Sequence, residues 1–144
     1  MKYPIAAVLA LAAFPLTILL GAAAPLAPIS PHQALANRGQ CVNVEGTASV
    51  RSDPQRPGLD VDLDGKNSSA FGYIEVQDQA QFPDISSLDG QRVSMTGVVQ
   101  FYLGRAEIKL TRAVQLAPAT GDDSAGLTHI GPEFARGNSP TACG

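Results

Sequence analysis

The stretch DGQRVSMTGVVQFYLGRAEIKL, residues 89–110, decides the fold that this sequence predicts. Apolar and polar residues alternate on both sides of Leu103-Gly104-Arg105, and such alternation is typical of strands with one buried face. Leu103-Gly104-Arg105, where the two runs meet around the glycine, is suited to a tight turn. We therefore predict two consecutive strands, residues 91–103 and 105–116, joined as a hairpin.

The residues before this hairpin predict three more strands and a short helix. Residues 41–50 alternate with period two, and the turn formers of SDPQRPG, residues 52–58, separate them from an aspartate-bearing strand at LDVDLDG, residues 59–65. AFGYIEVQD, residues 70–78, follows, with Ile74 and Val76 expected inward. In residues 81–90, Phe82, Ile85 and Leu88 recur every three residues, which predicts one or two helical turns ended by Gly90.

Two segments share the form V-x-x-x-G, Val42 to Gly46 and Val93 to Gly97. A glycine inside a strand often marks a bend, which strands of a small closed barrel need. The order strand–strand–strand–short helix–strand–strand resembles the OB-fold, a five-stranded Greek-key barrel. The resemblance covers residues 41–117 and is most specific in residues 89–110, which look like the last hairpin of OB domains. It extends to small exported bacterial OB-fold proteins and implies an all-β domain.

The row Asp60, Asp62, Asp64, followed by Gly65, also matches the start of a calcium loop. The twelfth position of such a loop supplies a bidentate glutamate, and here it is Phe71. Leu59, Val61 and Leu63 between the aspartates have the spacing of a strand. We therefore expect no metal and place the three aspartates on the outer face of a strand.

The N-terminus is typical of an export signal, since Lys2 precedes an apolar run over residues 5–24. We expect a signal peptide over residues 1–36, cut after Ala36, a linker over 37–40, the OB-fold domain over 41–117 and an irregular Pro- and Gly-rich tail over 118–144. An uncleaved membrane anchor is the alternative. Either way the domain is expected in the periplasm or outside the cell.

The remaining signals concern cysteines and charge. In an oxidising compartment Cys41 and Cys143 are able to form one disulfide, and the alternative is a buried Cys41 with a free Cys143. Residues 37–89 carry four basic and nine acidic residues, a balance of −5, whereas residues 90–116 carry a balance of +3. A general nucleic-acid binder needs a broad basic surface, and only a local basic strip is present.

The sequence offers little for catalysis, because His32 falls in the leader and His129 in the tail, and no nucleophile, metal or phosphate-loop motif is present. We expect a non-enzymatic binding module of the cell envelope without a cofactor. The resemblance places its site on the outer face of strands two and three and on the flanking loops. The candidate ligand-binding residues are Arg51, Arg56, Phe71, Tyr73, Tyr102, Arg105 and Lys109.

The ligand class stays open among an oligosaccharide, a peptide and a protein partner. Phe71 and Tyr73 are expected to face outward, or alternatively to cap the barrel beneath the first loop. One alternative function is binding of single-stranded nucleic acid through Tyr73, Tyr102, Arg105, Lys109 and Arg112, which the acidic second strand disfavours. Another is a structural barrel that docks on a larger envelope assembly. A membrane partner is expected only through an uncleaved N-terminal segment.

Overall fold

A computed structural model describes residues 24–119 and Cys143 of the chain. The strands are β1 (Pro28–Ile29), β2 (Cys41–Ser52), β3 (Gly58–Leu63), β4 (Ala70–Glu75), β5 (Arg92–Tyr102), β6 (Arg105–Lys109) and β7 (Leu116–Pro118). The helices are α1 (Pro31–Ala34) and four 3-10 helices, η1 (Leu35–Asn37), η2 (Val76–Gln81), η3 (Ile85–Leu88) and η4 (Ala113–Gln115).

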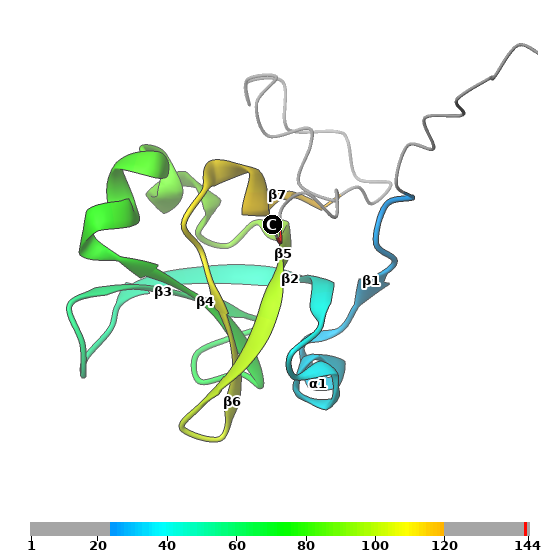
Figure 1. Ribbon diagram of the computed structural model, residues 1–144. Coiled ribbons are helices and arrows are strands. Elements are labelled where there is room, and N and C mark those ends of the chain that lie inside the picture. Colours follow the sequence, from blue (N-terminus) through cyan, green and yellow to red (C-terminus); the bar gives the residue numbers. More distant parts are fainter. Residues whose placement is uncertain (1–23, 120–142, 144) are drawn as a thin grey trace, which may run out of the picture.

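Five strands close into a barrel in the order β2-β3-β4-β6-β5, and β5 pairs back onto β2 (Figure 1). All these pairs are antiparallel except β4 with β6, which is parallel and requires the crossover that η2 and η3 supply. β1 extends the sheet beside β2, and β7 extends it beside β5. The predicted all-β, OB-like barrel is therefore confirmed, with 3-10 turns where a short helix was expected.

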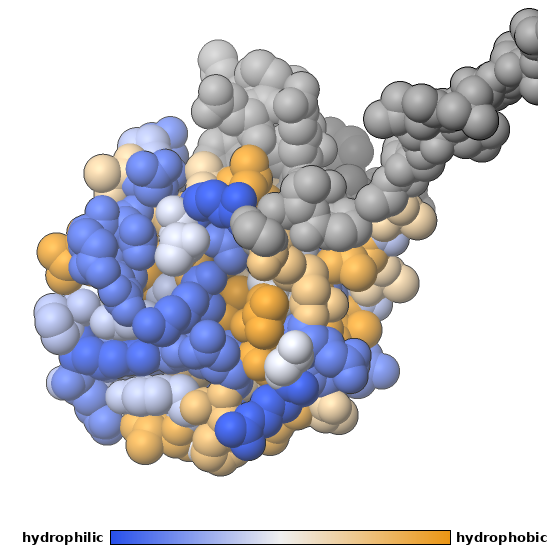
Figure 2. Space-filling view, in the orientation of Figure 1, coloured by the Kyte–Doolittle hydropathy of each residue, from blue (hydrophilic) through white to orange (hydrophobic). Residues whose placement is uncertain are grey.

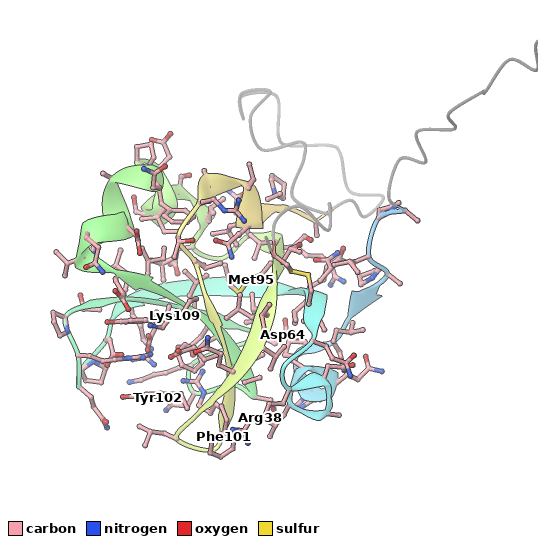
Figure 3. The ribbon with its side chains drawn as sticks, in the orientation of Figure 1. Arg38, Asp64, Met95, Phe101, Tyr102 and Lys109 are labelled. Atoms are coloured by element: carbon pink, nitrogen blue, oxygen red, sulfur yellow. A yellow bond between two sulfur atoms is a disulfide. The ribbon has the colours of Figure 1, made fainter. Side chains whose placement is uncertain are left out.

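The barrel interior holds the apolar side chains that alternate along its strands. Val44, Leu63, Met95 and Ile108 are almost completely buried, and Figure 3 shows Met95 within the barrel. Phe82 and Leu88, which flank the crossover turns, are also buried, as the spacing predicts. The core thus follows the alternation that the sequence displays.

One residue of this pattern is placed wrongly by the sequence. Ile74 is buried as expected, but Val76 is 57% exposed. The strand ends at Glu75, and η2 begins at Val76, so that the chain turns out of the sheet before Val76 can face inward. Strand alternation therefore ceases to apply there.

The two V-x-x-x-G segments lie opposite each other in the pair formed by β2 and β5. Val42 faces Gly97, and Gly46 faces Val93. A Cβ atom on Gly97 would lie 2.4 Å from Cγ2 of Ile108, which is far closer than carbon atoms approach. Gly97 is therefore required for the close approach of β5 to β6 across the barrel wall.

Folded elements begin before Cys41, where the sequence analysis placed the start of the domain. β1 pairs with β2 in parallel, and Ala34 at the end of α1 is completely buried in the core. Asn37 closes this segment, because its side-chain amide donates to the carbonyl oxygen of Gln33 at 2.9 Å. Residues 28–37 thus form part of the packed structure.

A disulfide joins Cys41, at the start of β2, to Cys143 (Figure 3). The Cα atoms lie 5.9 Å apart and the bridge spans 102 residues of sequence. Of the two alternatives that the sequence left open for these cysteines, the structure has the disulfide. Residues 1–23 of the expected signal peptide lie outside the described residues. Most of the expected tail, including His129, also lies outside them. Within the part that is described, no helix has the length and apolarity needed to cross a bilayer.

Candidate functional site

Three neighbouring strands present polar and aromatic side chains on one outer face of the barrel. Along β3, Asp60 and Asp62 alternate with buried apolar residues and therefore point away from the interior. Strand pairing sets Asp60 beside Tyr73 and Asp62 beside Phe71. On β6, which pairs with β4, Glu107 lies opposite Phe71. We call these five residues the outer acidic-aromatic face.

Arg51 and Arg105 reach this face from opposite sides and bind its aspartates. The Arg51 guanidinium donates to Asp60 Oδ2 at 2.8 Å and to Asp62 Oδ2 at 2.6 Å. Arg105 donates to Asp62 Oδ1 and, through Nε, to the carbonyl oxygen of Ser68 at 2.6 Å. Asp62 is fully buried with both oxygens paired, so its desolvated charge is compensated.

Arg56, in the loop between β2 and β3, fills the other half of the face. Its guanidinium carbon lies 3.5 Å from the ring centroid of Tyr73 and 3.8 Å from that of Tyr102. The same group donates to Asp53 at 2.7 Å and to Glu107. The loop arginine is therefore held by two carboxylates and two aromatic rings.

Within the part of the chain that the structure describes, one carboxylate of this network, that of Asp60, keeps a buried oxygen without a partner. The residue is 3% exposed, and its Oδ1 atom has no hydrogen-bond partner. Burial, reinforced by the negative charge of Asp53, raises the pKa of Asp60 to about 6. A buried acceptor without a donor costs free energy, typically about 1–3 kcal/mol.

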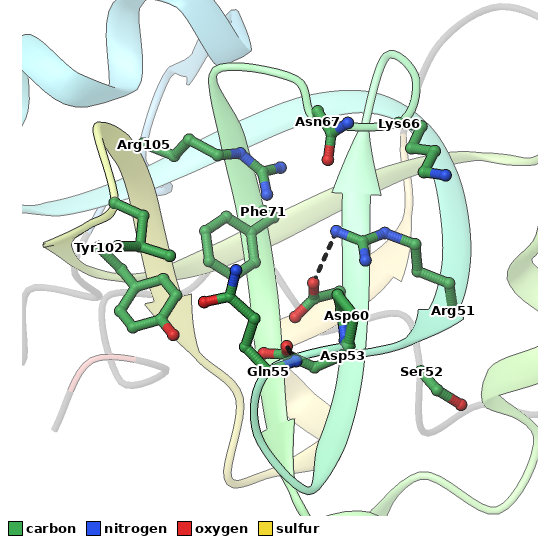
Figure 4. A pocket seen from close by; sticks show the side chains of 12 residues that line it. Arg51, Ser52, Asp53, Gln55, Asp60, Lys66, Asn67, Phe71, Tyr102 and Arg105 are labelled. Atoms are coloured by element: carbon green, nitrogen blue, oxygen red, sulfur yellow. Dashed lines mark hydrogen bonds and ion pairs between the residues drawn. The ribbon is translucent and has the colours of Figure 1, made fainter.

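A cavity of about 600 Å³ opens above this acid (Figure 4). It lies between the β2–β3 loop, the β3–β4 loop and the β5–β6 turn. Phe71 and Arg105 form part of its wall in Figure 4, and Asp60 lies beside the Arg51 guanidinium. Its lining residues are Arg51, Ser52, Asp53, Pro54, Gln55, Asp60, Lys66, Asn67, Phe71, Tyr102, Leu103 and Arg105. Volumes of this order accommodate small organic ligands.

The wall of the cavity is mostly apolar by area, whereas the outer surface around it is largely polar. Figure 2 shows mainly hydrophilic residues over the side of the barrel that carries β3 and β4, whereas hydrophobic residues gather along β5 and at the β5–β6 turn. At the lower end of β5, Phe101 is 53% exposed and lies beneath the guanidinium of Arg38, 5.6 Å from the ring centroid. Phe101 and Arg38 are not among the lining residues of the cavity. The aromatic part of the cavity wall is Phe71 and Tyr102, and charged side chains such as Arg51 and Lys66 complete it.

The structure brings most of the candidate residues together. Four of the seven line the cavity: Arg51, Phe71, Tyr102 and Arg105. Arg56 and Tyr73 adjoin it as a stacked pair but are absent from its lining. Lys109 lies apart, with its ammonium group 2.8 Å from Glu75 in an exposed ion pair.

Phe71 and Tyr73 occupy the outer face, but both are buried, at 1% and 5% exposure. Their covering comes from arginine side chains and from the first loop, since the Tyr73 hydroxyl donates to the carbonyl oxygen of Pro57 at 2.9 Å. This arrangement matches the alternative of capping beneath the first loop. For Phe71 it does not exclude ligand contact, because its ring also lines the cavity.

The aspartate row does not form a calcium loop. Asp60 and Asp62 form ion pairs with arginine side chains. Asp64 lies beyond the end of β3 with a φ of 62°, and its Oδ1 atom accepts a hydrogen bond from the backbone amide of Thr47 at 2.8 Å. Asp64 therefore belongs to a turn and not to the strand face that we predicted. Across residues 24–119 and Cys143, no three acidic, histidine or cysteine residues gather as metal ligands.

Several cavity residues escaped the sequence analysis because they belong to turns. Asp53, Gln55, Lys66, Asn67 and Leu103 line the cavity without any motif to mark them. The turn-forming composition of residues 52–58 was the available signal, since loops held by a rigid barrel often carry binding residues. The burial of Asp60 has no comparable signal in the sequence.

Comparison with known proteins adds little to this picture. No protein-family model matches the chain, and no curated protein matches it either. Among solved structures, a protein assigned as an aspartyl-tRNA synthetase from Leishmania major Friedlin is similar over 62% of this chain, with 14% identity and a TM-score of 0.39. The match covers 22% of that protein, so this chain spans about a fifth of its length.

Proposed function

We propose that this protein is an exported, non-enzymatic binding module of the cell envelope that holds a small polar ligand in the cavity above Asp60. The observation that carries the proposal is the cavity itself. It adjoins the β2–β3 loop and the β5–β6 turn, the loops that flank ligand sites in OB-like barrels, and its wall combines aromatic and charged side chains.

The paired charges support a binding role rather than catalysis. Around the cavity, Arg51 and Arg105 are engaged with buried aspartates at fixed distances. Ion pairs of this kind hold side chains in place and leave few groups free to exchange protons with a substrate. Such a preorganised wall suits recognition.

The charge pattern also weakens the alternative of single-stranded nucleic acid. Stacking of bases needs accessible aromatic faces, and those of Phe71 and Tyr73 are covered by arginines. Phosphate binding needs basic groups without acidic partners, and Arg56 and Arg105 each contact carboxylates. A compact ligand within the cavity would not require the arginines to uncover these aromatic faces, nor to leave their carboxylate partners.

The proposed location outside the cytoplasm has two supports. The apolar run at the N-terminus has the layout of an export signal. The disulfide between Cys41 and Cys143 is of a type that persists in oxidising compartments and is rare in the cytosol.

A cavity-blocking variant tests the proposal. Gln55 is exposed on the rim, so Gln55→Trp should fill the entrance without disturbing the core, and Gln81→Trp places the same side chain on an exposed site outside the cavity lining. A library of glycans, short peptides and oligonucleotides would be screened by amide chemical shifts. We expect compounds that shift signals around the cavity in the wild type and in Gln81→Trp but not in Gln55→Trp. Shifts that persist in Gln55→Trp, or no shifts at all, would refute a ligand site here.

A further inference from the structure

The unpaired oxygen of Asp60 defines what a ligand in the cavity must supply. Asp60 lines the cavity, and its Oδ2 atom is already engaged by Arg51. Its Oδ1 atom is buried and has no donor among residues 24–119 and Cys143. Because buried polar atoms are nearly always paired, this atom is a position for a hydrogen-bond donor from outside the chain.

The balance of charge in the ion-pair network that holds Asp60 gives the sign of that donor. The linked network contains three guanidinium groups, from Arg51, Arg56 and Arg105. It contains four carboxylates, from Asp53, Asp60, Asp62 and Glu107. With every group ionised, one negative charge is in excess, and the unpaired oxygen lies on Asp60. A donor with a positive charge would neutralise the network. Lys66 is a further cation of the cavity lining, but it is exposed on the rim, where solvent screens its charge.

We propose that the ligand carries a protonated primary amine, which donates to Asp60 Oδ1 inside the cavity. This inference rests on the proposed function of the same cavity and adds the chemical class of its ligand.

The geometry selects an ammonium group over other cations. A guanidinium binds best when both oxygens of a carboxylate accept it, and Arg51 already occupies one oxygen of Asp60. An ammonium is a compact point charge that needs a single acceptor. Calcium needs six to eight oxygens, which one free carboxylate oxygen does not provide.

Two pairs of probes test the inference at pH 7.5, where Asp60 is ionised. Glucosamine is compared with N-acetylglucosamine, and the tripeptide Gly-Lys-Gly, with both termini blocked, is compared with its Nε-acetyl form. Within each pair acetylation removes the charge of the amine. Binding would be measured by titration of the cavity amide signals. We expect the amine to bind at least about tenfold more tightly than the acetylated form in one pair, as a charged hydrogen bond implies. The pair that discriminates identifies the source as a sugar or a peptide.

Asp60→Asn supplies the matched change in the protein. It keeps the size of the side chain and removes the charge, so the affinity for the preferred amine should fall about tenfold or more. Asp64→Asn removes an equal charge from an exposed turn outside the cavity lining and should leave the affinity within about twofold.

The possible failures are distinct. If acetylated and free amines bind equally, or if Asp60→Asn binds the amine as tightly as the wild type, the amine inference is wrong while the cavity remains a binding site. If no amine probe binds the wild type but neutral library compounds shift the cavity signals, the amine inference is again refuted and the proposed binding function is not. If no probe and no library compound shifts those signals, both the amine inference and the proposed function are refuted. The probe comparison uses the unmodified protein and therefore holds even if a variant is poorly folded.

Discussion

Asp60→Asn should change how the stability of the protein depends on pH. Asp60 is buried, and Asp53 and Asp62 raise its pKa further, while Arg51 and Arg56 partly oppose the rise. The net result is a pKa of about 6 in place of the ordinary 3.8. The folded state therefore retains a proton between these two values that the unfolded state releases.

The sign and size of the effect follow from this difference. Because the pKa of Asp60 is higher in the folded state, its contribution is most favourable below pH 3.8 and is lost as the pH rises through about 6. At about 1.4 kcal/mol for each pH unit, the loss amounts to about 3 kcal/mol. Asn at position 60 does not titrate. The free energy of unfolding of the wild type, measured relative to Asp60→Asn, should therefore fall by about 2 kcal/mol between pH 4 and pH 7, because part of the total is already lost at pH 4.

Urea unfolding of both proteins at pH 4, 5, 6 and 7 and constant ionic strength measures this difference. Glu75→Gln is a control of opposite sign, because the hydrogen bond from Lys109 lowers the pKa of Glu75. The contribution of Glu75 to the free energy of unfolding is present above the ordinary pKa of 4.5 and is lost as the pH falls below it. A difference between wild type and Asp60→Asn that is flat with pH, or that grows as the pH rises, would refute the claim that Asp60 is held as a desolvated acid.

Three further perturbations test the fold. Replacing both cysteines of the disulfide with serine should lower the free energy of unfolding by about 2–5 kcal/mol, measured by urea unfolding, and an unchanged value would show that the bridge is not formed in solution. A chain that begins at Asn37 should lose at least about 2 kcal/mol relative to one that begins at Pro28, since it lacks the buried Ala34; equal melting temperatures would contradict the packing of this segment. Gly97→Ala should cost about 1–3 kcal/mol by overpacking against Ile108, and a thermal melt that matches the wild type would show that the strands separate easily.

Much of the barrel could be predicted because its information is local. Alternation along each strand gave the inward residues, and the spacing of Phe82 and Leu88 gave the crossover turns. The site depends instead on pairing between distant residues. Arg105 and Asp62 are 43 positions apart, and Arg56 and Glu107 are 51 apart, so no sequence window contains either contact. The local pattern shows which residues share a face but not which charges meet on it.

The N-terminal elements show a second limit of prediction. Residues 28–37 follow an apolar run and contain Pro31 and Ala34, whose composition fits a leader as well as a packed segment. Their place in the fold comes from β1 pairing with β2 and from burial of Ala34. Processing after Ala36 remains a prediction, and such a cut would remove both features.

The facing V-x-x-x-G segments of β2 and β5 act as a steric key for closing the barrel. In the observed register each valine lies opposite the glycine of the other strand, at both ends of a four-residue interval. The space at each glycine is limited by a third strand: a Cβ atom at Gly46 would meet Leu63 at the end of β3, and one at Gly97 would meet Ile108 of β6. Strands separated by about fifty residues meet late and in many trial alignments. If β2 shifted against β3, or β5 against β6, a residue with a side chain would enter one of these tight positions, so the two glycines favour the register in which the barrel closes.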